Sequence, residues 1–366
     1  MSENNYNSFP TRGQICANLA VYGTAHAAVD ATCAGILLTL WNRQILSTTE
    51  LGWYFCLYNL LAFGMQPVLG LALDRLRRPR SAAMAGCLLT ALATVGFAQW
   101  PLLAICEAGV GNALFHLGAG SICLNLTPGR AAAPGMFVAP GAAGLFLGTL
   151  LGRNGTFESL PFLVLLVVCC VAMWFLHLPA LDYRREHAPS HTRWSWAVLC
   201  MLLLCIGVRS AVGFGIALPW NEGMAWPLVL TGFVVLGKGL GGVLADRLGW
   251  GRVAVGALAL AAPLLAFGAK EPSAAITGMF LFNLPMAVTL VAGANLLPGR
   301  PAFAFGLTCL ALEAGAWLIM LPPGSERTID SEWLVFGAVF AAAAVLYLAL
   351  RAAFQRLAPR FTRVRL

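Results

Sequence analysis

Two residues in the first long apolar stretch have the types and the spacing for proton chemistry. His26 and Asp30 are four positions apart, so on a helix they share one face and lie one turn from each other. Because imidazole titrates near neutral pH, such a pair can hold or release a proton. We predict that Asp30 is a proton-coupling residue, assisted by His26, and that His116 and Glu313 belong to the same function.

Further polar side chains occur inside apolar stretches, where a charge facing lipid costs on the order of 3 kcal/mol. They must therefore face water, a protein partner or a solute. An arginine can bind a carboxylate or phosphonate, and a glutamate can meet a cation. The predicted substrate-binding residues are Arg209, Glu107, Asn283 and Asn112. An equally simple alternative is an ion pair between Asp30 and Arg209 that only braces the structure.

The stretches that carry these residues are long enough to cross a membrane. Hydrophobic residues make up 59% of the 366 positions and charged residues 10%, which is typical of an integral membrane protein. A helical span needs roughly 20 apolar residues. We therefore predict an all-α membrane protein with twelve transmembrane helices, at about 15–40, 51–73, 81–99, 102–126, 135–152, 160–178, 195–218, 226–245, 253–269, 273–297, 302–321 and 333–350.

Two polar strings at the ends of these stretches occur twice. DRLRRPR begins at Asp74 and returns as DRLGWGR at Asp246, and NLTPGR at Asn125 returns as NLLPGR at Asn295. Both repeats recur about 170 residues later, which indicates duplication of half the chain. The sequence thus predicts two pseudo-symmetric six-helix halves, 1–178 and 195–366, joined by a linker at 179–194, with a basic tail at the C-terminus. Internal repeats of this kind are typical of transporters.

Positive charge gives the expected orientation. Most of the 23 Lys and Arg residues fall on one side if both termini are cytoplasmic, as the positive-inside rule requires. The linker and the tail then lie inside the cell, and the expected location is the bacterial inner membrane. The net charge of +8 is explained by orientation and contact with anionic lipid, so we expect a lipid bilayer and no nucleic acid as a partner.

The repeated Asp-Arg strings resemble the G-x-x-x-D-R-x-G-R signature of the major facilitator superfamily, with Arg77 where that signature usually has glycine. The resemblance covers essentially the whole chain and implies the major facilitator fold. A carboxylate at the inner end of a helix can accept hydrogen bonds from a nearby arginine or from helix N-terminal amides, and so latch the halves in one state. The residues predicted to act in this gating are Gly70, Asp74, Arg75 and Arg78 in the first copy and Gly242, Asp246, Arg247 and Gly249 in the second.

The fifth span is rich in small residues around a proline. Pro140, Gly141 and Gly144 resemble the core of the antiporter signature of superfamily exporters. Small residues let helices approach closely and an internal proline permits a bend, so we predict that this span forms a tight seam between the halves. Ordinary packing without meaning for transport direction is the alternative.

Two further strings resemble a narrower group. HAAVD, from His26 to Asp30, and GNALFH, from Gly111 to His116, are similar to fosmidomycin-resistance-type drug exporters. Leu117 and Gly118 stand where that group usually has proline and an acidic residue, so its substrate does not carry over.

These resemblances imply a secondary transporter that moves a small organic solute by alternating access. We expect a monomeric proton-coupled antiporter working as an exporter, not an enzyme, which needs no cofactor besides the proton gradient. The alternatives are a proton-coupled importer, a metal carrier that uses His26, Asp30 and His116 as ligands, and a non-transporting membrane sensor of the same fold.

Overall fold

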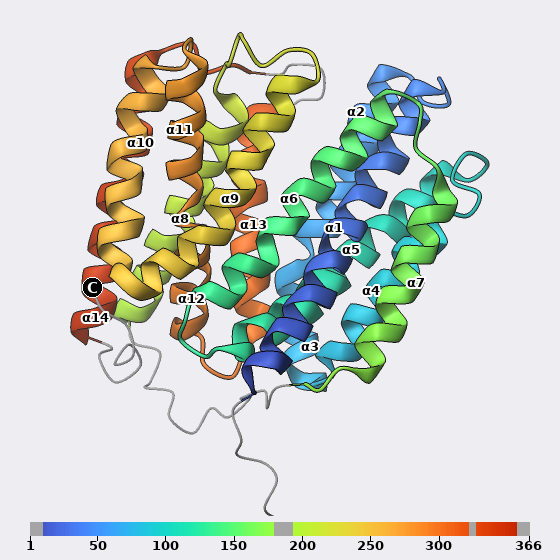
Figure 1. Cartoon of the computed structure of the whole chain (residues 1–366), viewed down its shortest axis with the longest axis horizontal. Helices are drawn as coiled ribbons and strands as arrows, with labels where there is room; N and C mark the ends of the chain where they lie inside the picture. The colour runs from blue at the N-terminus through green and yellow to red at the C-terminus, as the bar shows by residue number, and fades with distance from the viewer. Residues whose placement is uncertain (1–9, 179–192, 322–326, 357–366) are drawn as a thin grey trace, which may run out of the picture.

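The computed structural model describes residues 10–178, 193–321 and 327–356 (Figure 1). Apart from loops, an isolated β-bridge between Ile216 and Ile329 is the one non-helical feature within these ranges. The helices of the first half are α1 (Arg12–Asn42), α2 (Thr48–Asn59), the π-helical turn η1 (Leu60–Gly64), α3 (Gln66–Leu76), α4 (Pro79–Ala93), α5 (Pro101–Leu126), α6 (Ala132–Arg153) and α7 (Ser159–Phe175). Those of the second half are α8 (Arg193–Gly215), α9 (Ala225–Leu248), the π-helical turn η2 (Gly251–Val255), α10 (Gly256–Phe267), α11 (Pro272–Asn283), α12 (Met286–Leu296), α13 (Pro301–Met320) and α14 (Glu332–Arg356).

These elements form the twelve predicted spans in order. The elements outnumber the spans because three spans are interrupted helices. The second span consists of α2, η1 and α3, the ninth of η2 and α10, and the tenth of α11 and α12. In the described part of the chain, nine helices are long and apolar enough to cross a membrane. The tenth span breaks at Leu284 and Pro285, since proline lacks the N–H that would continue the helix.

The third span is shorter than predicted. The sequence suggests a helix over 81–99, but α4 ends at Ala93 and the hydroxyl of Thr94 bonds to the carbonyl of Ala91 at 2.7 Å. Gly96 then takes a φ of +73°, a conformation that glycine adopts without steric cost and a helix cannot contain. The apolar residues after Ala93 therefore belong to a turn that leads into α5.

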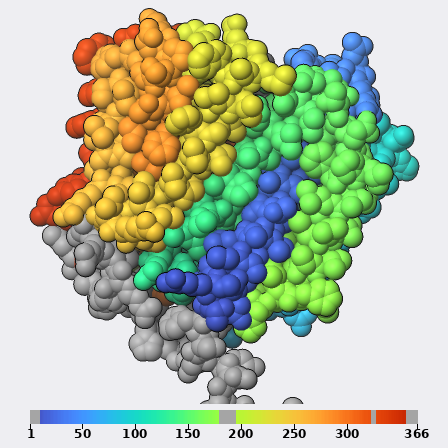
Figure 2. Space-filling view, viewed as in Figure 1, coloured from blue at the N-terminus to red at the C-terminus, as the bar shows by residue number. Residues whose placement is uncertain are grey.

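The two groups of helices lie side by side (Figure 1). They meet mainly through α6 against α9 and α3 against α13, and the first of these contacts runs diagonally across the face in Figure 2. The predicted linker at 179–194 lies outside the described residues except at its last two positions, and the tail beyond Arg356 also lies outside them. The boundaries of the two halves stay predictions.

Candidate functional site

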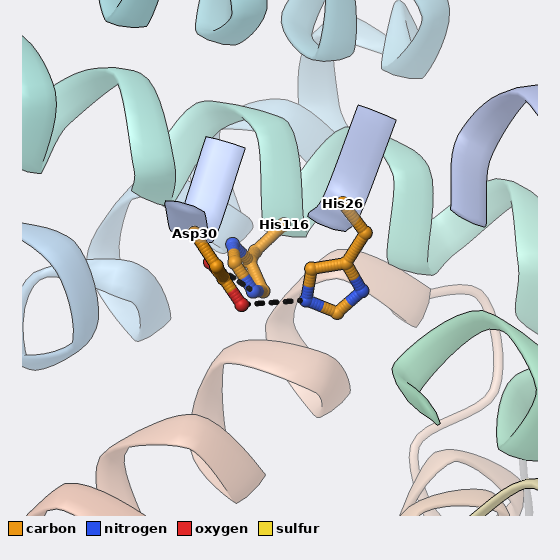
Figure 3. A group of neighbouring side chains, drawn as sticks. All are labelled: His26, Asp30 and His116. Atoms are coloured by element: carbon orange, nitrogen blue, oxygen red, sulfur yellow. Dashed lines mark ion pairs between the residues drawn. The ribbon is translucent and has the colours of Figure 1, made fainter. Parts of the chain in front are cut away.

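The Asp30 carboxylate faces two neighbouring histidines that come from two helices (Figure 3). His26 and Asp30 are one turn apart on α1, and Nε2 of His26 is 3.3 Å from Oδ2 of Asp30. His116 comes from α5, with its Nε2 3.9 Å from Oδ1 of the same carboxylate. Both imidazoles are buried, whereas 16% of the Asp30 side chain is exposed. The structure thus brings together three of the four predicted proton-coupling residues.

Backbone carbonyls orient both rings. Nδ1 of His26 is 2.8 Å from the carbonyl oxygen of Phe137 on α6, and Nδ1 of His116 is 2.9 Å from that of Asn112 on α5. A carbonyl only accepts a hydrogen bond, so each Nδ1 carries the hydrogen. Both Nε2 atoms are left to face Asp30.

This orientation determines how many protons the cluster holds. A neutral His26 with its hydrogen on Nδ1 has a lone pair on Nε2, which would then face an ionised Asp30 oxygen, another acceptor. The 3.3 Å contact is favourable only when a proton lies on Nε2 or on the carboxyl group. His26 and Asp30 are therefore arranged to share one proton beyond those of a neutral imidazole and a carboxylate.

The surroundings include residues that sequence reasoning missed or placed elsewhere. Asn112, predicted to bind substrate, donates from Nδ2 to Oδ1 of Asp30 at 3.1 Å and so belongs to the proton cluster. The rings of Phe115 and Phe137 lie against His26, and that of Phe305 from the other half lies 6.3 Å from His116. The Phe-His pair in GNALFH hints at Phe115, but Phe137 acts through its backbone, which no side-chain motif reveals.

The glycines of α6 allow α1 to approach it closely. A Cβ at Gly141 would overlap the His26 ring, and one at Gly144 would overlap the backbone of Ala27. These contacts lie within the first half. The predicted span does form a seam between the halves, since α6 packs against α9, but Gly141 and Gly144 face α1 and do not form that seam. Gly135 of α6 lies at the contact with the other half, where an added Cβ would be 2.9 Å from the carbonyl oxygen of Lys238 on α9.

Replacing Gly144 by alanine is expected to destabilise the protein by about 1–3 kcal/mol, because the new methyl group forces α1 away from α6. The measurement is the thermal unfolding midpoint of the purified protein in detergent. Gly232→Ala on α9 is the matched control, since a Cβ there meets nothing within 4 Å. Equal midpoints for the two variants would show that the α1–α6 contact tolerates a side chain.

The repeated strings pair crosswise between the halves. Oδ1 and Oδ2 of Asp74, at the end of α3, accept hydrogen bonds from the backbone N–H groups of Ala302 and Phe303, at 3.0 and 2.9 Å. These amides lie at the N-terminus of α13, where the helix dipole favours negative charge. We call this contact the Asp74 latch.

The second copy makes the same contact in the opposite direction. Oδ1 and Oδ2 of Asp246, at the end of α9, accept from the backbone N–H groups of Ala131 and Ala132 at the start of α6, both at 2.9 Å. Nε1 of Trp250 also donates to Oδ1 at 3.1 Å. We call this contact the Asp246 latch. Helix N-terminal amides, one of the two kinds of partner predicted for these carboxylates, bind both aspartates.

The other residues of the repeated strings shape the latches. A Cβ at Gly70 would lie 2.7 Å from the Ala302 carbonyl oxygen, and one at Gly242 would overlap the Ala131 carbonyl. Arg77 and Gly249, each three positions after the aspartate, both have positive φ, at 56° and 105°. The arginine thus adopts the conformation for which the signature uses glycine. Arg75, Arg78 and Arg247 are exposed.

The remaining predicted residues lie away from the Asp30 cluster. Arg209 on α8 donates from Nη2 to the Phe282 carbonyl oxygen at 2.7 Å, so the alternative ion pair with Asp30 is not present. Asn283, at the end of α11, donates to the Met279 carbonyl oxygen at 2.8 Å. Glu107 is nine residues before His116 on α5, about 13 Å along the helix axis.

Glu313 is not part of the cluster either. It lies on α13, is 5% exposed, and its buried Oε1 has no hydrogen-bond partner among the described residues. Trp317 is one turn further along the same helix, and its Nε1 likewise has no partner there. Glu313 is therefore a separate buried carboxyl group in the second half.

The Asp30 cluster also has the donor atoms of a metal site. His26, Asp30 and His116 each offer one ligand atom, and these atoms lie within 4.8 Å of one another. Imidazole and carboxylate suit several transition metals. The geometry is therefore compatible with the metal-carrier alternative as well as with proton binding.

The chain resembles known transporters over most of its length. No known family profile matches it. It is 26% identical over 351 residues to YfnC, an uncharacterized MFS-type transporter of Bacillus subtilis (strain 168), and the match covers 81% of this chain and 83% of YfnC.

Two crystal structures of FucP share the fold. One, of the E. coli fucose:proton symporter, gives a TM-score of 0.65 at 12% identity and covers 93% of this chain and 97% of that chain. The other, FucP in the outward conformation, gives a TM-score of 0.67 at 12% identity and covers 92% of this chain and 99% of that chain. These similar proteins are transporters and not enzymes, as we expect for this chain. The twelve-span bundle and the match to YfnC make the chain similar to transporters of the major facilitator superfamily, whose fold it shares.

Proposed function

We propose that this chain is a proton-coupled secondary transporter that moves a small organic solute across the membrane by alternating access. The observation that carries the proposal is the 3.3 Å contact between Nε2 of His26 and Oδ2 of Asp30, which Asn112 and His116 surround. Asp30 is the most exposed member, so it is the group through which that proton can enter and leave. No other cofactor is proposed, and the proton gradient supplies the energy.

Alternating access requires that the two ends of the protein close in turn. The Asp74 and Asp246 latches join the halves at one end of the bundle. Proton or solute binding shifts this equilibrium only by favouring one of the two states. The latches are therefore the proposed closed gate of the state described here.

The direction of transport is a separate part of the proposal. The small residues around Pro140 resemble an exporter signature, whereas FucP is named a fucose:proton symporter. The α6 glycines pack against α1, which ordinary close packing explains, so they do not favour either direction. We further propose a monomer in the bacterial inner membrane with both termini in the cytoplasm, because the basic residues gather on that side.

The test is the internal pH of proteoliposomes that contain the purified protein, recorded while pooled metabolites, drugs or metal salts are added outside. Proton coupling predicts a compound-dependent pH change, and its sign separates exchange from cotransport. Solute movement without any pH change would leave a carrier but remove proton coupling. A response to metal salts alone would favour the metal carrier.

A further inference from the structure

Arg209 is a buried cation with most of its hydrogen-bonding capacity unused. It is 8% exposed, and its Nη2 donates to the carbonyl oxygen of Phe282, at the end of α11. Its guanidinium carbon lies 5.4 Å from the Phe282 ring centroid. Nε is buried without a hydrogen-bond partner among the described residues. Because a guanidinium offers five N–H donors in a planar fork, this side chain is held in place by one bond and has donors left over.

Lys238 on α9 brings a second cation close to Arg209. A Cβ at Gly237 would lie 2.5 Å from the Phe280 carbonyl oxygen, and one at Gly241 would overlap the Leu284 carbonyl. This part of α9 therefore packs against the end of α11 that holds Arg209. Lys238 follows Gly237 directly and is half-buried, so its side chain starts from the part of α9 that packs against α11.

Among the described residues, no ion pair joins Arg209 or Lys238 to an acidic side chain. The oxygens of Asp30 already face His26, His116 and Asn112. Within the described ranges, the ion pairs are those of Asp30 with the histidines and that of Lys270 with Glu332. A buried Arg209 and a half-buried Lys238 without an acidic partner among the described residues are costly to keep in a membrane protein. Charged residues at such positions commonly mark a solute path.

We infer that Arg209 and Lys238 bind an anionic group of the transported solute, a carboxylate or a phosphonate. This inference rests on the proposed transport function and names the class of its substrate. The free donors of Arg209 can form a forked pair of hydrogen bonds with such a group, and Lys238 adds a point charge. The site lies at the break between α11 and α12, where the helix stops at Asn283. Broken helices near mid-membrane form solute sites in many transporters.

The solute-binding half and the proton-binding half face each other in this arrangement. Arg209 and Lys238 belong to α8 and α9, whereas His26, Asp30 and His116 belong to α1 and α5. α9 packs against α6, whose Phe137 carbonyl oxygen accepts the hydrogen bond from Nδ1 of His26. An anion held by Arg209 and Lys238 would take none of the hydrogen bonds of the proton site.

The test is binding by the intact purified protein in detergent at constant pH, read as the rise of the unfolding midpoint with ligand concentration. The probes are succinate and methylphosphonate, with uncharged succinamide as the matched neutral compound. We expect at least one anion to stabilise the wild type and succinamide not to do so. Arg209→Gln and Lys238→Gln should each weaken the apparent affinity by about tenfold or more, and Arg209→Lys should lose less than Arg209→Gln.

Lys270→Gln is the control, because this lysine is 80% exposed and 3.6 Å from Glu332 at the surface; it should bind like the wild type. Equal stabilisation by succinamide, no stabilisation by either anion, or unchanged anion affinity in Lys238→Gln would overturn the inference. The assay uses no proton gradient. A protein that binds anions but shows no pH-coupled transport would therefore keep this site while the proposed function fails.

Discussion

Asp30→Asn is expected to reduce the compound-dependent pH change in proteoliposomes to the level of protein-free liposomes, while the protein still folds. The physical reason lies in the hydrogen bonds of the cluster. The amide of the new asparagine can donate to Nε2 of His26, while Nδ1–H of His26 continues to donate to the Phe137 carbonyl oxygen. The amide oxygen of the new asparagine can still accept the hydrogen bond from Asn112. The variant therefore satisfies the same contacts with no extra proton, so the site no longer gains and loses one.

Asp330→Asn is the matched control for this prediction, because Asp330 is an exposed carboxylate whose Oδ1 accepts a hydrogen bond from the hydroxyl of Thr328 at 2.7 Å. It should transport like the wild type. Unfolding midpoints of both variants in detergent verify that folding is intact. A pH change of normal size in Asp30→Asn would exclude Asp30 as the coupling site.

Asp74→Asn and Asp246→Asn, alone and combined, should open the latched end of the bundle. Each substitution removes the charge that two helix N-terminal amides bind, a loss of about 1–2 kcal/mol. A loss of about 1.4 kcal/mol raises the population of the open state roughly tenfold. Hydrogen–deuterium exchange of the amides of Ala131, Ala132, Ala302 and Phe303 measures this opening directly.

The informative result is the effect on the distant latch. If both latches close the same gate, Asp74→Asn should also raise exchange at Ala131 and Ala132, which Asp74 does not contact. The double variant should then show the summed free-energy change of the single variants. Glu271→Gln, at an exposed helix start without a side-chain cap, serves as control. Changes confined to the substituted latch would mean that the two latches open independently.

Much of the fold could be predicted from the sequence, because the length of each apolar stretch indicates a membrane span and the repeated strings indicate how the chain divides into halves. Twelve apolar stretches predict twelve spans, and the repeats at Asp74 and Asp246 predict two equivalent halves that meet at these strings. The His26–Asp30 pair was predictable because helical spacing alone places both side chains on one face. His116 required the additional assumption that the first and fourth spans are neighbours.

Other features depend on tertiary packing that a single sequence does not reveal. The glycines of α6 predict close approach, but not that the partner is α1 rather than the other half. The role of Phe137 depends on its carbonyl oxygen, which every residue type possesses. The charge of Arg209 was apparent, but its lack of an acidic partner emerged only when the positions of Asp30 and Glu313 were known.

The crosswise latches give the closed end the symmetry of an isologous dimer interface, in which each partner offers the same surface to the other. Each half supplies one aspartate and one helix N-terminus, so a half on its own contains both members of the contact. Two copies of one six-helix half could close this end as a homodimer. The covalent connection in the present chain keeps the second half at a high effective concentration near the first. The two halves therefore need not stay identical, and in the function proposed above one half binds protons and the other binds solute.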